Sequence, residues 1–200
     1  MTFDLRAIFT NNSVGVAYTD DGEPYGGRGG AVFNEGENST ILFNGLALFK
    51  RNVGALGGCA LASRGYLLSE DDDDLAAGDN KVVFASKAKF KDNYCDGDYP
   101  TIYSDRNDEY KGGGALLAYG ITCIDFINTA VFKRNEAPSG GAIVNSAEMS
   151  FISDAKLFTD GNVDNGNCSD ILNNGDGTIS IGTYTFTGFS NSLCDRTSTA

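Results

Sequence analysis

The sequence from Ile124 to Ile143 reads I-D-F-I-N-T-A-V-F-K-R-N-E-A-P-S-G-G-A-I, and its pattern recurs along the chain. A phenylalanine is followed first by an alanine, then by a second phenylalanine, then by an asparagine, and finally by two glycines and an alanine. Further copies of the pattern begin at Phe3, Phe43 and Phe84. Recurrence of one pattern at similar intervals is typical of a repeat protein, whose successive units stack on one another.

Aligning the copies places like residues in columns. The columns contain two sets of phenylalanines (Phe43, Phe84 and Phe126; Phe49, Phe90 and Phe132) and one set of asparagines (Asn12, Asn52, Asn93 and Asn135). Two divergent copies extend these columns, one through Phe151, Ala155, Leu157 and Asp160, the other through Phe186, Ser190, Ser192 and Asp195. We expect like side chains to lie above one another as ladders, at the strand spacing of about 4.8 Å.

Apolar residues alternate with other residues over short runs, as in Ile41/Phe43 and Val82/Phe84. A period of two predicts β-strands with one buried face, and not helices. A single unit cannot bury its inner face alone, so the units must stack. The sequence therefore predicts an all-β fold, a parallel β-helix (a solenoid) of about five to six coils.

Glycine pairs precede an alanine in the copies, where the backbone needs a positive φ or a close approach to another segment. The copies of this motif are Gly29-Gly30-Ala31, Gly57-Gly58-Cys59, Gly113-Gly114-Ala115 and Gly140-Gly141-Ala142. In this alignment Cys59 takes the place of the alanine. We therefore expect Cys59 to be a small buried thiol.

One domain is expected, residues 1–195, followed by a frayed polar tail at 196–200. Three long segments interrupt the columns and are interpreted as loops inserted at one corner of the coil, namely 13–28, 63–80 and 94–111. The first copy begins without the polar capping element that a solenoid usually carries. We expect the N-terminal coil end to be open, or to be covered by another chain.

The segments F-K-R-N (132–135) and G-G-A-I (140–143) resemble the FxxN and GGA[ILV] repeats of the chlamydial polymorphic outer-membrane proteins. The first motif also occurs at 49–52 and 90–93, and the second at 29–32 and 113–116. The resemblance extends from Phe3 to about Asp160. It implies a right-handed parallel β-helix and a surface-exposed, adhesin-like passenger.

Charge and composition exclude several classes of function. The net charge of −12 and the pI near 4.3 disfavour nucleic acid as a partner, because phosphate binding requires a basic surface. The chain contains no histidine, which excludes histidine-dependent hydrolases and histidine metal ligands. No apolar run approaches about 18 residues, so we expect no transmembrane segment. No signal peptide is visible, and we expect an extracellular, cell-surface or organelle-lumen location after removal of a leader.

A short basic ridge is expected beside the second phenylalanine column. It consists of Lys50, Arg51, Lys91, Lys133 and Arg134. Stacked cations repel one another unless anions lie beside them. Two interpretations stay open: Asp92 and the acidic loops neutralise the ridge, or the ridge docks an anionic partner. Such a partner would be an acidic protein face or a sulfated or uronic polysaccharide.

Calcium is the one cofactor that the sequence suggests, because Glu70–Asp74 and the segment 160–176 are rich in oxygen ligands. Adjacent carboxylates cannot all face one ion, and Ile171 occupies a position where a calcium loop needs a ligand. We therefore expect solvated turns and no bound cofactor. Cys168 and Cys194 are expected to form a disulfide if the compartment is oxidising.

The sequence thus predicts a non-enzymatic, secreted or surface β-helix that acts as an adhesion or binding module. One alternative is a structural subunit docked in a larger assembly, including a membrane-associated one, which the apolar Leu48, Ile127 and Val131 would favour. The other alternative is a polysaccharide-active enzyme that uses Asp96 and Asp98. Spacing along the chain cannot supply the separation that a catalytic carboxylate pair requires.

Overall fold

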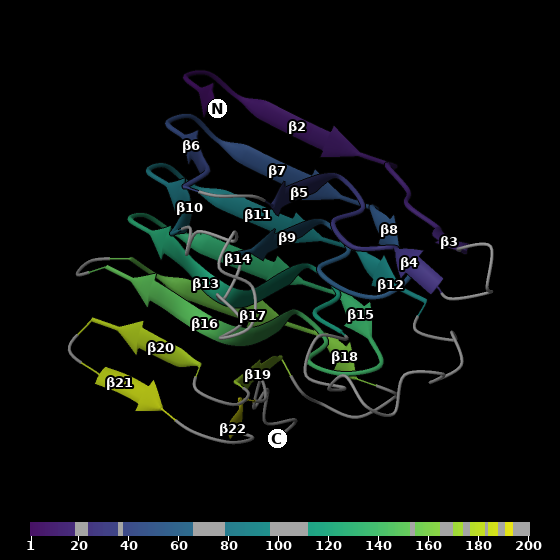
Figure 1. Ribbon diagram of the computed structural model, residues 1–200. Coiled ribbons are helices and arrows are strands. Elements are labelled where there is room, and N and C mark those ends of the chain that lie inside the picture. The colour runs from purple at the N-terminus through teal and green to yellow at the C-terminus, as the bar shows by residue number, and fades with distance from the viewer. Residues whose placement is uncertain are drawn as a thin grey trace, which may run out of the picture.

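The computed structural model describes residues 1–18, 24–35, 38–65, 79–96, 112–152, 155–164, 170–173, 177–182, 184–187 and 191–193. Throughout these residues the secondary structure consists of strands and turns, without a helix. The strands form three larger sheets and one small hairpin, and most neighbouring strands are parallel (Figure 1). The predicted all-β class with parallel strands is confirmed.

Eleven strands form the long sheet. They are β1 (Thr2–Phe3), β5 (Val32–Glu35), β6 (Thr40–Phe43), β9 (Leu61–Arg64), β10 (Asn80–Phe84), β13 (Leu116–Phe126), β16 (Ile143–Phe151), β19 (Ile171–Asn173), β20 (Thr178–Ile181), β21 (Tyr184–Thr187) and β22 (Asn191–Leu193). Two of them, β13 and β16, are long because each continues through a bend where other repeats have two separate strands. The first half of β13 pairs with β9, and its second half pairs with β10.

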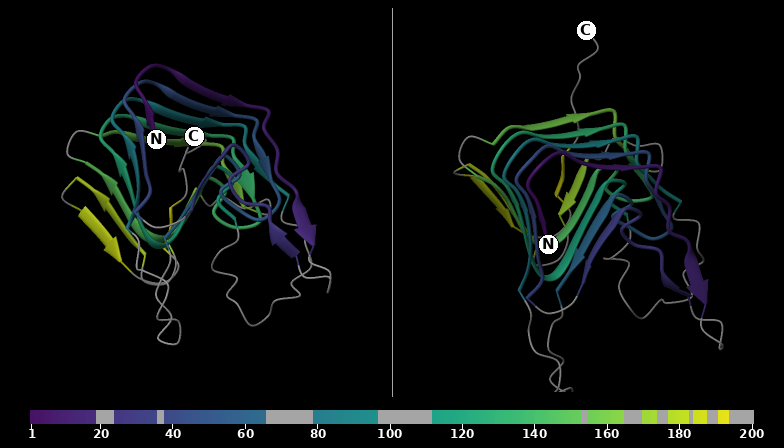
Figure 2. Two further views of the ribbon diagram at one scale, coloured as in Figure 1. Left: turned by 45° about the horizontal axis from the view of Figure 1, so that its top comes forward. Right: turned by 90° about the horizontal axis from the view of Figure 1, so that it is seen from above.

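Two further parallel sheets complete each repeat. The five-stranded sheet has the spatial order β2 (Ala7–Thr10), β7 (Ala47–Lys50), β11 (Ala88–Lys91), β14 (Ala130–Lys133) and β17 (Leu157–Asp160). The four-stranded sheet has the order β8 (Val53–Gly54), β12 (Tyr94–Cys95), β15 (Glu136–Ala137) and β18 (Val163–Asp164). A separate hairpin consists of β3 (Val16–Tyr18) and β4 (Pro24–Gly26). Successive repeats visit the sheets in the same order, so equivalent strands lie side by side (Figure 2).

Phenylalanines from successive repeats stack inside the sheets. In the first column, Phe3, Phe43, Phe84, Phe126 and Phe151 have ring centroids 4.8 to 5.0 Å apart. In the second column, Phe9, Phe49, Phe90 and Phe132 stack with centroids 4.8 Å apart. Rings of the two columns meet edge to face. Each such aromatic contact stabilises the fold by about 0.5–1.5 kcal/mol beyond the burial of its area.

The fifth repeat departs from the predicted alignment by two residues. Leu157, and not Ala155, pairs with Ala130, and Thr159 pairs with Phe132. The turn after Phe151 is two residues longer than the turn after Phe126, so every later residue moves by two. Because side chains alternate with a period of two, a shift of two keeps the buried face buried.

The predicted sixth repeat is also corrected. Ile181 pairs with Phe151 and thereby takes the position that the sequence alignment gave to Phe186. Phe186 belongs to β21, which runs antiparallel to β20 and pairs with Ile179. Ser192 belongs to β22, which is antiparallel to β19. The last strands therefore turn back along the sheet instead of adding another parallel repeat.

The second glycine motif is Gly58-Cys59-Ala60, one residue later than predicted. The amide of Ala31 donates to the carbonyl of Ala60, whose own amide donates to the carbonyl of Ala115. Gly58 has φ +54°, as Gly113 has φ +68°. Cys59 therefore replaces the second glycine of the motif and not its alanine.

The sequence led us to expect a free buried thiol at Cys59. The structure corrects this, because Cys59 forms a disulfide with Cys95 of the next repeat. Gly54 makes room for it, because a Cβ on Gly54 would lie 2.5 Å from the Sγ of Cys59. In the neighbouring repeats the column of Gly54 holds Cys95 and Ala137. One repeat thus has glycine at the first position and cysteine at the second (Gly54 and Cys59), whereas the next repeat has cysteine at the first and glycine at the second (Cys95 and Gly114).

Insertions enter at two corners of the repeat and not at one. The segment with the β3–β4 hairpin and the segment between β12 and β13 both lead from the five- and four-stranded sheets back to the long sheet. The segment between β9 and β10 instead connects two strands of the long sheet. The segments predicted as loops also include strand residues, such as Tyr94 and Cys95 of β12 and Asn80 of β10.

Candidate binding face

The outward side of the five-stranded sheet gathers positively charged side chains. Each of its strands directs two residues outward, and the residue just before the strand is aligned by the same backbone hydrogen bonds. Seven of these fifteen positions are lysine or arginine and one, Asp160, is acidic. We call the seven cations the basic face: Arg6, Lys50, Lys87, Lys89, Lys91, Lys133 and Lys156.

Strand β11 provides the centre of the basic face. Ala88 and Phe90 are fully buried, so the alternation of the strand directs Lys87, Lys89 and Lys91 outward. Lys91 pairs in register with Lys50 on one side and Lys133 on the other. The column that the sequence predicted at Lys50, Lys91 and Lys133 is thus formed by neighbouring strands.

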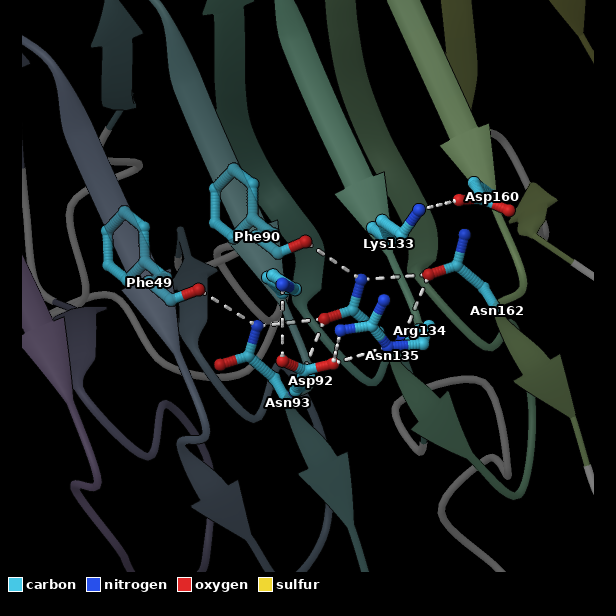
Figure 3. A network of polar contacts seen from close by, with 10 residues as sticks. Phe49, Phe90, Asp92, Asn93, Lys133, Arg134, Asn135, Asp160 and Asn162 are labelled. Atoms are coloured by element: carbon cyan, nitrogen blue, oxygen red, sulfur yellow. Dashed lines mark hydrogen bonds and ion pairs between the residues drawn. The ribbon is translucent and has the colours of Figure 1, made fainter.

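Carboxylates neutralise part of the predicted ridge (Figure 3). Arg134 donates from Nε and Nη2 to Oδ1 of Asp92 at 2.8 and 2.7 Å, and Nζ of Lys91 lies 3.9 Å from Oδ2 of Asp92. Lys133 forms an ion pair with Asp160. The hydrogen bond and the charge of Lys133 hold the pKa of Asp160 below its ordinary value. Neighbouring carboxylates therefore neutralise three of the five ridge residues: Asp92 pairs with Lys91 and Arg134, and Asp160 pairs with Lys133.

The remaining cations of this surface make no ion pair with a described residue. They are Arg6, Lys50, Arg51, Lys87, Lys89 and Lys156. Lys89 belongs to β11, the middle strand of the sheet, Lys87 directly precedes that strand, and both lie beside the predicted ridge. Sequence reasoning missed these two residues. The alternation of Lys with the buried Ala88 and Phe90 is the signal that could have found them.

An apolar column crosses the basic face. It consists of Ile8, Leu48, Val131 and Phe158, with Lys89 in register between Leu48 and Val131. The end residues Ile8 and Phe158 are 50% and 53% exposed, and the middle ones are half-buried. The predicted exposure of Leu48 and Val131 is therefore partial.

An asparagine ladder supports the edge of the basic face (Figure 3). It consists of Asn12, Asn52, Asn93, Asn135 and Asn162. Nδ2 of Asn93 donates to Oδ1 of Asn135 at 2.8 Å and to the carbonyl of Phe49 at 3.3 Å. Asn162, and not the predicted Asp160, continues the ladder.

Each residue that precedes a ladder asparagine has left-handed backbone conformation. The φ angles of Asn11, Arg51, Asp92, Arg134 and Gly161 lie between 51° and 60°. This conformation turns the chain sharply, so that the asparagine points inward and the preceding side chain remains at the rim. The same turn in successive repeats aligns Arg51, Asp92 and Arg134 along the edge of the basic face.

A second charged cluster lies on the outward side of the long sheet. Nζ of Lys81 lies 2.8 Å from Oδ2 of Asp125, and the thiol of Cys123 donates to Oδ1 of Asp125 at 3.4 Å. The hydrogen bond with Asp125 raises the pKa of Lys81. Burial, followed by the charge of Asp125, raises the pKa of Cys123 to about 12. The thiol is therefore held in its unreactive, protonated form.

Several predicted site residues lie outside the described part of the chain: Glu70–Asp74, Asp98, Cys168 and Cys194. Asp96 is exposed, and its carboxylate accepts a hydrogen bond from the hydroxyl of Tyr94 at 3.5 Å. Within the described ranges, His, Cys, Asp and Glu side chains form no group of three or more that could hold a metal ion. The same ranges contain no helix of the length and apolarity needed to span a membrane.

Comparison with known proteins gives no match to this chain among protein-family models, curated proteins or solved structures. The basic face and its contacts are therefore the basis for the function considered below.

Proposed function

We propose that this chain is a right-handed parallel β-helix that works as a non-enzymatic binding module, secreted or exposed at a cell surface. Its basic face docks an anionic partner. One observation carries the proposal: lysines that lie far apart in the sequence gather on one sheet of a chain whose net charge is −12. A local charge of this sign attracts anions despite the acidic remainder of the protein.

The packing of the repeats supports a role as a rigid platform. Stacked phenylalanines and the asparagine ladder fix each strand relative to the next, so the lysines are held at regular spacings. A preorganised surface loses little conformational entropy when a partner binds. Parallel strands that return in register after each repeat are the arrangement expected of β-helix coils.

The disulfide between Cys59 and Cys95 supports a location outside the cytosol. Disulfides form and persist in oxidising compartments, whereas cytosolic thiols are kept reduced. This location agrees with the resemblance of the F-x-x-N and G-G-A segments to the surface-exposed passengers of polymorphic outer-membrane proteins. An adhesion or binding role follows from that location together with the basic face.

The test is retention of polyanions on the immobilised full chain at low salt. Dextran sulfate and poly-glutamate serve as probes, because the proposal at this level requires only an anionic partner. We expect the wild type to retain at least one of the two probes. A variant with Lys87, Lys89 and Lys156 changed to Gln should retain that probe less strongly. Retention of neither probe, or equal retention by the variant, would contradict the proposal. Shortening of the dextran sulfate, measured by size-exclusion chromatography, would contradict the non-enzymatic role.

A further inference from the structure

We propose that the partner of the basic face is a linear polysaccharide that carries sulfate or carboxylate groups. The polymer lies across the five strands, with its sugar rings on the apolar column and its charges on the flanking lysines. This inference rests on the proposed function and names the class of partner for the same surface.

Cations that have no ion-pair partner among the described residues lie on both sides of the apolar column. Lys87 and Lys156 flank it on the side where the strands begin, and Lys50 flanks it on the side where they end. Lys89 lies within the column itself. Lys87 and Lys89 are about 7 Å apart along the direction of β11, and Lys87 and Lys156, which lie two strands apart, are separated by about 10 Å. Anionic groups that project from both edges of a chain of sugars can meet cations of this arrangement.

The apolar column accounts for the choice of a sugar polymer over an acidic polypeptide. Ile8 and Phe158 are about half exposed, at 50% and 53%, although burial of such side chains is favourable. Sugar rings have apolar C–H faces and polar edges, so a ring can cover an apolar side chain while its charged groups point sideways. An acidic polypeptide presents its carboxylates at the ends of flexible side chains and has no comparable use for the column.

The length and the regularity of the face favour a polymer with a repeating unit. Five strands at about 4.8 Å spacing extend over about 19 Å, enough for several sugar units. Identical spacings from strand to strand let a repeating chain form the same contact more than once. Contacts linked in one polymer add their free energies with little further entropic cost, so weak individual contacts give useful affinity.

The nature of the cations agrees with this class of ligand. All but Arg6 are lysines. A lysine carries a compact charge on a flexible stem and makes no fixed bidentate contact, in contrast to arginine. A row of lysines therefore suits distributed sulfate or carboxylate groups better than one precisely placed group. The stem of Lys89 can also lie against a sugar ring while its ammonium group contacts an anion.

The experiment is a calorimetric titration of the full chain with dextran sulfate, polygalacturonate, uncharged dextran and poly-glutamate. We expect the two charged polysaccharides to bind more tightly than poly-glutamate of equal charge, and uncharged dextran not to bind. Changing Lys87, Lys89 and Lys156 to Gln should weaken binding of the charged polysaccharides by at least about fivefold, the sum expected for three exposed ion pairs. Phe158→Ala should weaken it by about threefold through loss of apolar contact.

A control variant adds the same charge away from the basic face. Asn38→Asp, Thr40→Glu and Val53→Glu together change the net charge by −3, as the lysine variant does. Asn38, Thr40 and Val53 are exposed. Other repeats carry an acidic residue in the column of Thr40 (Glu148) and in the column of Val53 (Glu136). We expect this variant to bind within about twofold of the wild type, because distant exposed charges are screened.

Three results would overturn the inference. If poly-glutamate binds as tightly as the charged polysaccharides and Phe158→Ala has no effect on binding, the assignment of the partner as a polysaccharide is wrong. The proposed docking of an anionic partner then still stands. If no polyanion binds, both the inference and the proposed function fail. If sedimentation shows a dimer of the wild type and a monomer of the lysine variant, the face is occupied by a second copy of the chain.

Discussion

At two corners of the repeat, buried polar side chains bond one repeat to the next, and the two corners do so with different sets of residues. The first corner, between the five- and four-stranded sheets, is the asparagine ladder, in which successive repeats contribute the same residue. The second corner, where the two halves of the long sheet meet, uses different residues in different repeats. They are Asn34, Ser63, Asn80, Thr122, Asn145 and Asn173.

Backbone regularity explains the difference. At the first corner each repeat makes the same left-handed turn, so the same amide can bond to the next repeat each time. At the second corner the chain is continuous in β13 and β16 but is interrupted between β9 and β10. Ser63 there bonds to Thr122 at 2.7 Å, and Asn80 donates to the carbonyl of Arg64 at 2.5 Å. A corner is repeated in sequence only where its backbone is repeated in space.

The largest expected effect comes from the aromatic packing behind the first corner. Phe90 is fully buried and stacks on Phe49 and Phe132, so Phe90→Ala should lower the free energy of unfolding by about 3–5 kcal/mol. Phe158→Ala on the same sheet, at an exposed position, should change it by less than about 0.5 kcal/mol. Chemical denaturation of both variants measures the difference. Similar losses for the two would contradict stacking as the source of stability.

The disulfide is expected to be the next largest contribution. Cys59→Gly together with Cys95→Ala restores the small residues that other repeats carry at these positions. Loss of the cross-link should reduce stability by about 2–4 kcal/mol, since it constrains the unfolded chain. Denaturation of the variant, compared with that of the oxidised wild type, measures this effect. An unchanged midpoint would show that Cys59 and Cys95 are not joined in the folded protein.

The asparagine ladder should tolerate substitution less well than the second corner. Asn93→Ala removes an acceptor that serves both the amide and the side chain of Asn52, and the loss should be about 2–3 kcal/mol. Asn145→Ala removes donors to Asn173 and to two carbonyls, and should cost about 1–2 kcal/mol. Thermal unfolding followed by circular dichroism ranks the two variants. The reverse order would contradict the comparison of the corners.

The smallest expected effect is the pH dependence of stability that arises from Cys123, which follows Thr122 on the outward side of the second corner. The pKa of Cys123 is raised to about 12, from an ordinary value of 9.0. At pH 10 an unfolded thiol is mostly ionised while this one stays protonated, so stability is full below pH 9 and falls as the pH rises toward 12. Alkylation of Cys123 at pH 10, followed by mass spectrometry, should therefore be slow in the folded protein and fast in the unfolded one.

Asp125→Asn is the matched variant for this prediction. It removes a neighbouring negative charge and leaves Lys81 without its ion-pair partner, and both changes favour the thiolate. We expect alkylation of the folded variant to be faster than that of the wild type. Equal rates would assign the raised pKa to burial alone.

The parallel strands and the inward columns could be predicted from the sequence because identical residues recur at the same spacing. The alignment of Phe43, Phe84 and Phe126 did not depend on the structure of the loops between them. The fifth repeat could not be aligned in this way. Its longer turn moved the ladder position from Asp160 to Asn162, and a shift of two leaves the alternation unchanged.

The basic face was predictable only in part. The ridge at Lys50, Lys91 and Lys133 repeats from copy to copy, and so it was visible in the alignment. Lys87 and Lys89 occur in a single repeat and give no column. The disulfide of Cys59 and Cys95 depends on Gly54 in a neighbouring column, and such a compensating exchange is visible only when the repeats are superposed in space.

In-register stacking of equivalent strands is the claim on which the basic face and both corners depend. Nuclear Overhauser contacts from the backbone amide of Lys89 test it most directly. The register predicts contacts to the backbone of Leu48 on one side and of Val131 on the other. Contacts shifted by one residue, or confined to the repeat that contains Lys89, would contradict it.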